Sequence, residues 1–132
     1  MAFIEWDEKY DIHVDAMNDQ HKHLMHLMNN LFELNESKAA KPVISKAISD
    51  LGAAAQSHFA DEEAYMESLE YPELARHKIV HKQLLEKYGG HAEAFAAGEG
   101  ELSKEFFNFI RLWLAAHIQG IDMKYGDYAN NN

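Results

Sequence analysis

The sequence predicts an all-α fold, an up-down-up-down four-helix bundle with an ordered N-terminal arm. Apolar residues recur at helical spacing in four successive stretches, and no stretch shows the alternation of a β-strand. The breaks between these stretches are short, which favours antiparallel packing of neighbouring helices. With 132 residues, the chain is long enough to bury one hydrophobic core, so we expect a single domain over residues 1–132.

The N-terminal arm is expected over residues 1–17, where aromatic and acidic side chains are mixed. The first helix is expected over residues 18–37, because Asn18 or Asp19 can cap the free N–H groups of its first turn. Lys38–Lys41 would end it. Residues three or four positions apart give this helix one inward face, formed by His21, Leu24, Met25, Met28, Leu31, Phe32 and Asn35.

The second helix is expected over residues 42–68, since Pro42 suits the first turn of a helix. The third is expected over residues 72–97, weakened but not ended by the pair Gly89-Gly90. Gly98-Glu99-Gly100 marks the last break, and Ser103 can cap the fourth helix, expected over residues 102–119. The inward stripe of the second helix consists of Ile44, Ile48, Leu51, Ala55, His58, Glu62, Tyr65 or Met66, and Leu69.

The composition excludes several classes of function. The chain carries 22 Asp and Glu against 12 Lys and Arg, a net charge of −10 with histidine neutral, so we expect no nucleic-acid partner. It shows no secretion signal and no apolar run of the roughly 18 residues that a membrane span needs. We therefore expect a cytoplasmic protein that is not membrane-embedded. Its acidic surface, poor in apolar patches, favours a monomer.

Imidazole and carboxylate side chains interrupt the inward faces of the predicted helices. His58 and Glu62, and likewise His77 and His81, are four residues apart, so each pair projects from one face of its helix. In antiparallel order, both pairs and His21 fall at the same end of the bundle. Leucine would pack better in a core, so this repeated pattern indicates a metal site. The absence of cysteine leaves only nitrogen and oxygen ligands for it.

The fourth helix contributes His117 and Asp122, which are five residues apart. A regular α-helix would splay this pair by roughly 140°, but Gly120 between them can let the helix distort or end and turn the carboxylate inward. The full set of candidate ligands is His21, His58, Glu62, His77, His81, His117 and Asp122.

Seven donors are too many for one metal ion and suit two. If both carboxylates bridge and one oxygen atom lies between the metals, one position around two six-coordinate ions stays open for a small neutral ligand. The donor types alone admit zinc, copper, manganese or iron. The remaining histidines share no common face and are expected to be solvated; they are His13, His23, His26 and His91.

These motifs resemble the hemerythrin family, in particular its single-domain bacterial members, over nearly the whole chain. The resemblance rests on Trp6, Asp19-Gln20-His21-Lys22-x-Leu24, His58-Phe59-x-x-Glu62-Glu63, His77-x-x-x-His81 and His117-Ile118-x-x-x-Asp122. Every ligand position carries the residue type and spacing of the family. His13 departs from the pattern, because related bacterial sequences often have a small residue there, and this affects the packing of the arm and not the metal site.

The resemblance implies reversible O2 binding at a non-haem di-iron centre, for oxygen transport, storage or delivery. It implies that His77, His81 and His117 hold one iron and that His21 and His58 hold the other, which keeps an open position. Glu62 and Asp122, with an oxo or hydroxo group, would then bridge the two irons. An O2-consuming enzyme is a possible recipient.

Apolar residues beside His117 are expected to control access of O2 to the metals. Leu114 lies one turn earlier on the same face, and Trp113 and Ile118 flank it. A di-iron redox enzyme, similar to a peroxidase or ferroxidase, is one alternative, but a histidine-dominated site favours binding over oxidation chemistry. An O2 or redox sensor is the other, although a sensor normally carries an output domain. We therefore expect a binding protein and not an enzyme.

Overall fold

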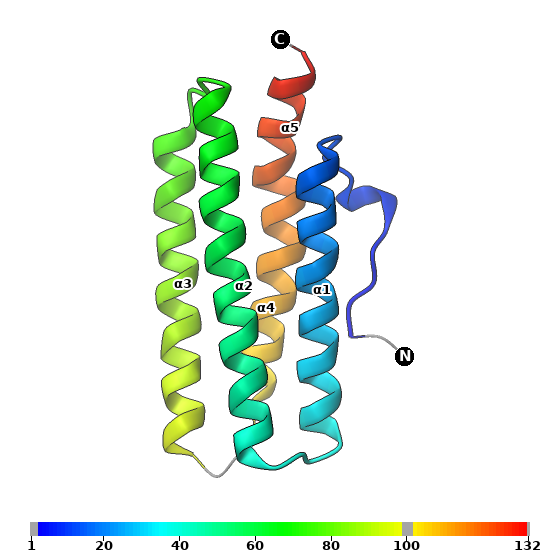
Figure 1. Cartoon of the computed structure of the whole chain (residues 1–132), viewed down its shortest axis with the longest axis vertical. Coiled ribbons are helices and arrows are strands. Elements are labelled where there is room, and N and C mark those ends of the chain that lie inside the picture. Colours follow the sequence, from blue (N-terminus) through cyan, green and yellow to red (C-terminus); the bar gives the residue numbers. More distant parts are fainter. Residues whose placement is uncertain (1–2, 99–101, 132) are drawn as a thin grey trace.

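The computed structural model describes residues 3–98 and 102–131, and within them it contains helices and no strand. Figure 1 shows antiparallel helices with the chain passing up and down the bundle, which confirms the predicted all-α four-helix fold. A short 3-10 helix and three α-helices precede one long rod of three segments. The elements are η1 (Glu8–Tyr10), α1 (Asp15–Glu36), α2 (Lys41–Ser68), α3 (Leu74–Ala97), α4 (Lys104–His117), η2 (Ile118–Asp122) and α5 (Met123–Asn130).

The first helix begins three residues earlier than expected, at Asp15, because Asn18 does not cap it. The Asn18 side chain instead accepts a hydrogen bond from the Ile12 N–H at 3.1 Å and donates one to Asp11 Oδ1 at 2.7 Å. Asn18 therefore lies inside the helix and ties the preceding arm to it. A polar residue that satisfies a neighbouring segment can occupy a helical position as well as a cap.

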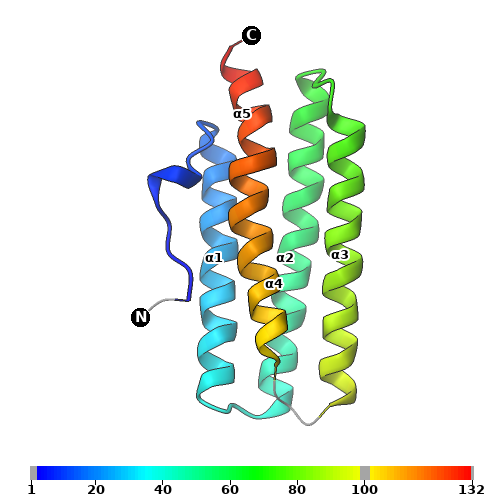
Figure 2. The same ribbon diagram turned by 180° about the vertical axis from the view of Figure 1, so that it is seen from behind.

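The fourth helix does not end at residue 119. It begins at Lys104, two residues later than expected, and Ser103 caps it as predicted, since its hydroxyl accepts from the Phe106 N–H at 3.1 Å. After His117 the chain makes one π-helical turn, η2, and continues as α5 to Asn130. Figure 2 shows α4 and α5 as one continuous rod. The third helix begins at Leu74, after a turn closed by the Leu74 N–H on the Tyr71 carbonyl.

The N-terminal arm lies alongside α1 and is ordered over its described part (Figure 2). The Phe3 ring packs against Phe32 at 4.9 Å and Phe107 at 5.5 Å between centroids, and the Arg111 guanidinium lies 4.3 Å from its centroid. The Asn29 amide donates to the Ile4 carbonyl and accepts from the Ile4 N–H. Residues 1–2 of the expected arm, and residues 99–101 of the last break, lie outside the described residues.

The apolar core fills the bundle toward the end that holds the α1–α2 connection. Fully buried side chains there include Leu31 of α1, Ile44 of α2 and Ile110 of α4. Toward the opposite end, the same inward faces carry the predicted histidines and carboxylates. The bundle thus has an apolar core at one end and a polar cluster toward the other. No described helix is long and apolar enough to cross a membrane.

Candidate metal centre

The π-helical turn η2 brings His117 and Asp122 to the same side of their helix. Its backbone bonds span five residues, as shown by the Met123 N–H bonding to the Ile118 carbonyl. One extra residue per turn compensates for the five-residue spacing that would splay the two side chains on an α-helix. Gly120 lies within the turn, but a Cβ added there would contact nothing within 4 Å. The backbone insertion, and not close packing at Gly120, therefore aims the carboxylate inward.

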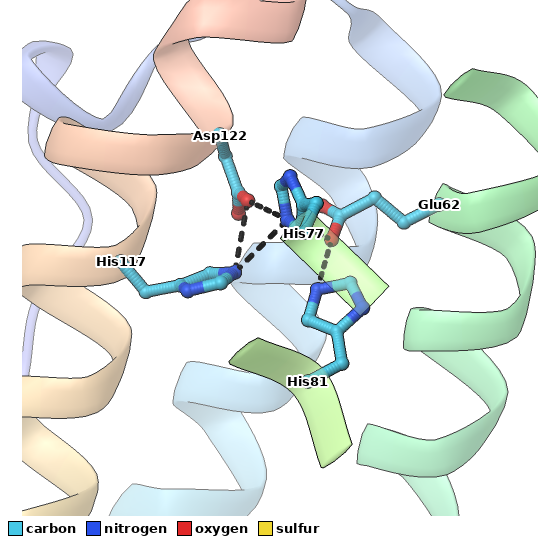
Figure 3. Close-up of side chains that lie close together, drawn as sticks. All are labelled: Glu62, His77, His81, His117 and Asp122. Carbon is cyan, nitrogen blue, oxygen red and sulfur yellow. Dashed lines mark hydrogen bonds and ion pairs between the residues drawn. The ribbon is translucent and has the colours of Figure 1, made fainter. Parts of the chain in front are cut away.

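All seven predicted ligand residues lie together at one end of the bundle, and each is buried. They form two overlapping groups, in each of which one ligand atom per residue lies within 4.8 Å of the others. One group is Glu62, His77, His81, His117 and Asp122, drawn in Figure 3, and the other is His21, His58, Glu62 and Asp122. The two carboxylates belong to both groups.

Glu62 divides its two oxygens between the two groups. Its Oε1 lies 3.0 Å from His81 Nε2 and 3.5 Å from His77 Nε2. Its Oε2 lies 3.3 Å from His58 Nε2 and 3.5 Å from His21 Nε2. One carboxylate thus faces imidazoles of α3 with one oxygen and imidazoles of α2 and α1 with the other.

Asp122 divides its oxygens in the same way. Its Oδ1 lies 3.0 Å from both His77 Nε2 and His117 Nε2, and its Oδ2 lies 3.2 Å from His21 Nε2. Figure 3 shows His77 and His117 turned toward this carboxylate from different helices. Two carboxylates that each span two sets of imidazoles form the donor arrangement of a pair of metal ions.

Several donor atoms of this cluster are buried without a hydrogen-bond partner. They include His21 Nε2, His81 Nε2, Glu62 Oε1 and both carboxylate oxygens of Asp122. Buried polar atoms are costly unless something satisfies them, and these atoms converge on one volume. The residues therefore fit nitrogen- and oxygen-ligated metal cations.

Charges within the cluster balance one another without metal. Burial acts to lower the pKa of His21 and of His77, but the Asp122 and Glu62 carboxylates close to both rings outweigh it and raise both pKa values to about 9. Burial acts to raise the pKa of Glu62, yet the four histidines around the carboxylate hold it well below its ordinary value. Burial and the charge of Glu62 likewise oppose ionisation of Asp122, and His117 and His21 keep its pKa low. Protons in the metal-free chain thus supply positive charge that metal cations can supply instead.

Three residues outside the predicted set hydrogen-bond to it. Gln20 Oε1 lies 2.7 Å from His58 Nδ1, and Glu63 Oε2 lies 2.8 Å from His81 Nδ1. The buried Tyr125 hydroxyl donates to Glu62 Oε2 at 2.6 Å. Burial and the nearby Glu62 carboxylate raise the Tyr125 pKa far above its ordinary value, so the phenol keeps its proton.

Aromatic packing closes one side of the cluster. The Phe59 ring stacks on His81 at 3.9 Å between centroids and lies 5.7 Å from the Trp113 ring. The Trp113 ring thus packs on Phe59, which itself stacks on the His81 imidazole. Leu114 and Ile118, the other two predicted access residues, are buried, with Leu114 one helical turn before His117.

The sequence contained a signal for some of these additional residues. Gln20, Phe59 and Glu63 each adjoin a predicted ligand in the chain, and helical geometry places such neighbours about 100° away, on the flank of the site. Tyr125 follows Asp122 by three residues, a spacing that places both on one helix face. Because the helix was expected to end at residue 119, this spacing was not recognised.

The four histidines that were expected to be solvated belong to neither group of ligand atoms among the described residues. His13, His23 and His26 are exposed, and His91 is half-buried with its ring stacked on Phe109 at 5.3 Å. His13 adopts a positive φ of 62° in the arm, a conformation that glycine adopts more easily than histidine.

Comparison with known proteins supports a cation-binding role for this cluster. A family model described as "Hemerythrin HHE cation binding domain" matches residues 13–129. The bacteriohemerythrin of Stenotrophomonas maltophilia is 31% identical over 127 residues, covering 96% of this chain and 82% of that protein. The bacteriohemerythrin of Methylococcus capsulatus is 30% identical, with 96% of both chains covered.

Similarity extends to a myohemerythrin and to crystal structures. The myohemerythrin of Theromyzon tessulatum is 29% identical, covering 92% of this chain and 89% of that protein. The crystal structure of a wild-type hemerythrin superposes with a TM-score of 0.87 at 29% identity, covering 96% of this chain and 97% of that one. A leucine-to-alanine variant of a hemerythrin gives a TM-score of 0.89.

Proposed function

The chain belongs to the hemerythrin family, and from this membership we propose that it binds O2 reversibly at a non-haem di-iron centre. The observation that carries the proposal is the division of Glu62 and Asp122 between two sets of imidazoles. When bound, a pair of ferrous ions supplies the two electrons that reversible O2 binding requires. The expected role is oxygen transport, storage or delivery.

The proposed ligand assignment follows the two groups of donor atoms. His77, His81 and His117 would hold one iron, and His21 and His58 would hold the other. Glu62 and Asp122 would bridge the pair together with an oxo or hydroxo group. The His21/His58 group offers fewer imidazoles, which supports placing the open coordination position there.

The surrounding protein would protect the bound gas from water. Phe59 stacks on the His81 ring, and Trp113 packs on Phe59. Leu114 and Ile118 are buried beside His117. An apolar enclosure keeps water and protons from the metals, and this protection favours release of O2 over oxidation of iron. Tyr125 holds Glu62 in place through its 2.6 Å hydrogen bond.

Metal analysis combined with optical spectroscopy tests the function. Iron-loaded, reduced protein is measured without O2, after exposure to air, and after removal of the gas. We expect a pair of irons per chain and a visible band that appears with O2 and disappears when O2 is removed. A chain without iron, or one that consumes Fe²⁺ or peroxide in rapid turnover, would contradict the proposal and favour the di-iron enzyme.

The ligand assignment has its own test in His77→Ala. This substitution removes an Nε2 that lies 3.0 Å from Asp122 and 3.5 Å from Glu62, so we expect loss of the paired centre. Exposed His26 provides the matched control, since His26→Ala should keep both irons. Two irons per chain in His77→Ala would show the assignment to be wrong.

The proposal also includes a cytoplasmic monomer that is not an enzyme and that delivers O2 to an O2-consuming enzyme. The monomer is supported by the surface, since only Val43, Ile79 and Leu112 are large, apolar and exposed among the described residues. The binding role is supported by relatives named bacteriohemerythrin and myohemerythrin.

A further inference from the structure

We propose that Gln20 and Asp61 are positioning residues that hold the His58 imidazole in one tautomer. The residue that contacts His58 is a neutral amide, whereas the residue that contacts the outer nitrogen of His81 is a carboxylate. The inference deepens the proposed function, because it rests on His58 being a ligand of one metal and His81 of the other. It concerns the side of the site where the open coordination position is proposed.

The first step is the contact between His58 and Gln20. The Nδ1 atom of His58 lies 2.7 Å from Gln20 Oε1, and an amide oxygen can only accept a hydrogen bond. His58 Nδ1 must therefore carry the proton. A metal ion can then bind this ring only through Nε2, the atom that lies 3.3 Å from Glu62 Oε2 and faces the metal positions.

The second step is the role of Asp61, which fixes the orientation of the amide. Gln20 Nε2 donates to Asp61 Oδ2 at 3.0 Å, and an ionised carboxylate only accepts. A flipped amide would bring its oxygen against the carboxylate and its NH2 group against His58 Nδ1. In that orientation two acceptors, the Gln20 oxygen and the Asp61 carboxylate, would repel each other. It would also favour the His58 tautomer whose lone pair is on Nδ1, away from the metals. Asp61 is exposed, so it can be replaced without disturbing the core.

The hydrogen bonds that connect His58, Gln20 and Asp61 lie next to ligand residues on two helices. Gln20 directly precedes His21 on α1, and Asp61 directly precedes Glu62 on α2. The Gln20–Asp61 bond therefore links the two helices one residue away from two ligands. Together with His58, both residues line a pocket of about 200 Å³ at the surface.

The support behind His81 has a different charge. Its Nδ1 lies 2.8 Å from Glu63 Oε2, so a carboxylate fixes this ring in the same tautomer. A carboxylate partner also makes an imidazole a stronger electron donor to its metal, whereas a neutral amide does so less. The outer nitrogens of the other three histidines have no hydrogen-bond partner; they are His21 Nδ1, His77 Nδ1 and His117 Nδ1.

The two metal positions are therefore unequal in the strength of their ligands. The position near His77, His81 and His117 has more imidazoles and the anionic support of Glu63. The position near His21 and His58 has fewer imidazoles and a neutral support that depends on Asp61. The latter position holds its metal less tightly, and loss of Gln20 or Asp61 weakens that position first.

The proton on His58 Nδ1 is measured in the full-length, metal-free chain by long-range ¹H–¹⁵N NMR. We expect wild-type His58 to carry its proton on Nδ1. Asp61→Asn, whose amide both donates and accepts, should give a mixture of tautomers, as should Gln20→Leu, which removes the acceptor. The matched control is Asp50→Asn, an exposed carboxylate of the same helix that pairs with Lys46, and it should leave His58 unchanged.

A second measurement uses Co²⁺ alone as the probe and titrates it into the same variants. We expect two binding steps in the wild type, and Asp61→Asn should weaken only the weaker step, by roughly 10–100-fold. Glu63→Gln should weaken the tighter step instead. Unchanged His58 tautomers in both variants, or an unchanged weaker step in Asp61→Asn, would overturn the inference. A chain that binds two Co²⁺ and keeps this tautomer pattern, yet fails to bind O2 with iron, would refute only the proposed function.

Discussion

Glu62 and Asp122 are stable as buried anions because of the imidazoles around them. Each carboxylate is fully buried, a position in which an isolated charge would be neutralised by a shift in pKa. The histidines reverse that shift for both groups, and Tyr125 adds a hydrogen bond to Glu62. The same contacts that stabilise the charges also point one oxygen of each carboxylate toward each set of imidazoles.

Leu114→Ala should speed oxidation of the O2-bound protein, since a buried leucine one turn before His117 would no longer exclude water. A loss of about 1.4 kcal/mol of barrier would raise the rate roughly tenfold. The rate is measured from the decay of the O2-bound spectrum. Leu112→Ala is the matched control, because Leu112 lies on the same helix but is 66% exposed. Equal rates in the two variants would show that Leu114 does not control access.

The candidate ligands could be selected from sequence because polar residues on an apolar helix face are conspicuous. The spacing of His58 and Glu62, and that of His77 and His81, already placed each pair on one face. The supporting residues could not be selected in this way. Gln20 and Asp61 are polar residues of a kind common on helix surfaces, and only the direction of the Gln20 side chain brings it into contact with both His58 and Asp61.

At the scale of elements, the rod formed by α4, η2 and α5 departs most from the prediction. The five-residue spacing of His117 and Asp122 indicated a distortion, but a sequence does not distinguish a π-helical turn from a helix end. The start of α1 was misplaced for a related reason. Asn18 has the side chain of a helix cap, and tertiary contacts with the arm use it otherwise.

The arm and α5 meet at Gly126, where a side chain cannot fit. A Cβ added to Gly126 would overlap the Ile12 carbonyl oxygen and crowd the Ile12 Cβ, while Asn130 donates to the His13 carbonyl nearby. The arm thus braces the helix that carries Tyr125.

Gly126→Ala should push the arm away from α5 and lower the free energy of unfolding by about 1–3 kcal/mol, as overpacking does. Denaturant unfolding of the metal-free chain measures the change. Gly90→Ala is the control, since a Cβ there meets nothing within 4 Å and alanine should stabilise α3 by roughly 1 kcal/mol. Equal stability of the Gly126→Ala variant and the wild type would show that the arm adapts without cost.

At the scale of the whole molecule, the bundle has two ends with different sources of stability. The end with Leu31, Ile44 and Ile110 buries ordinary apolar side chains. The other end buries five imidazoles and two carboxylates, several of whose polar atoms have no partner. The topology could be predicted from the four amphipathic stretches, and with it the meeting of distant ligands at one end. The relative stability of the two ends depends on the burial and hydrogen bonding of individual side chains, which cannot be predicted from the sequence.

Removal of the metals should therefore loosen one end of the bundle and leave the other intact. A metal present at 100 times its dissociation constant stabilises the folded chain by about 2.7 kcal/mol, which corresponds to a shift of the melting temperature on the order of 10 °C. Calorimetry with and without a chelator measures the shift, and His77→Ala should show almost none. Hydrogen exchange locates it: amides of η2 and α5 should lose protection, while amides near Leu31 and Ile44 keep theirs because their packing contains no ligand. Uniform loss of protection would mean that the apolar end depends on the metals as well.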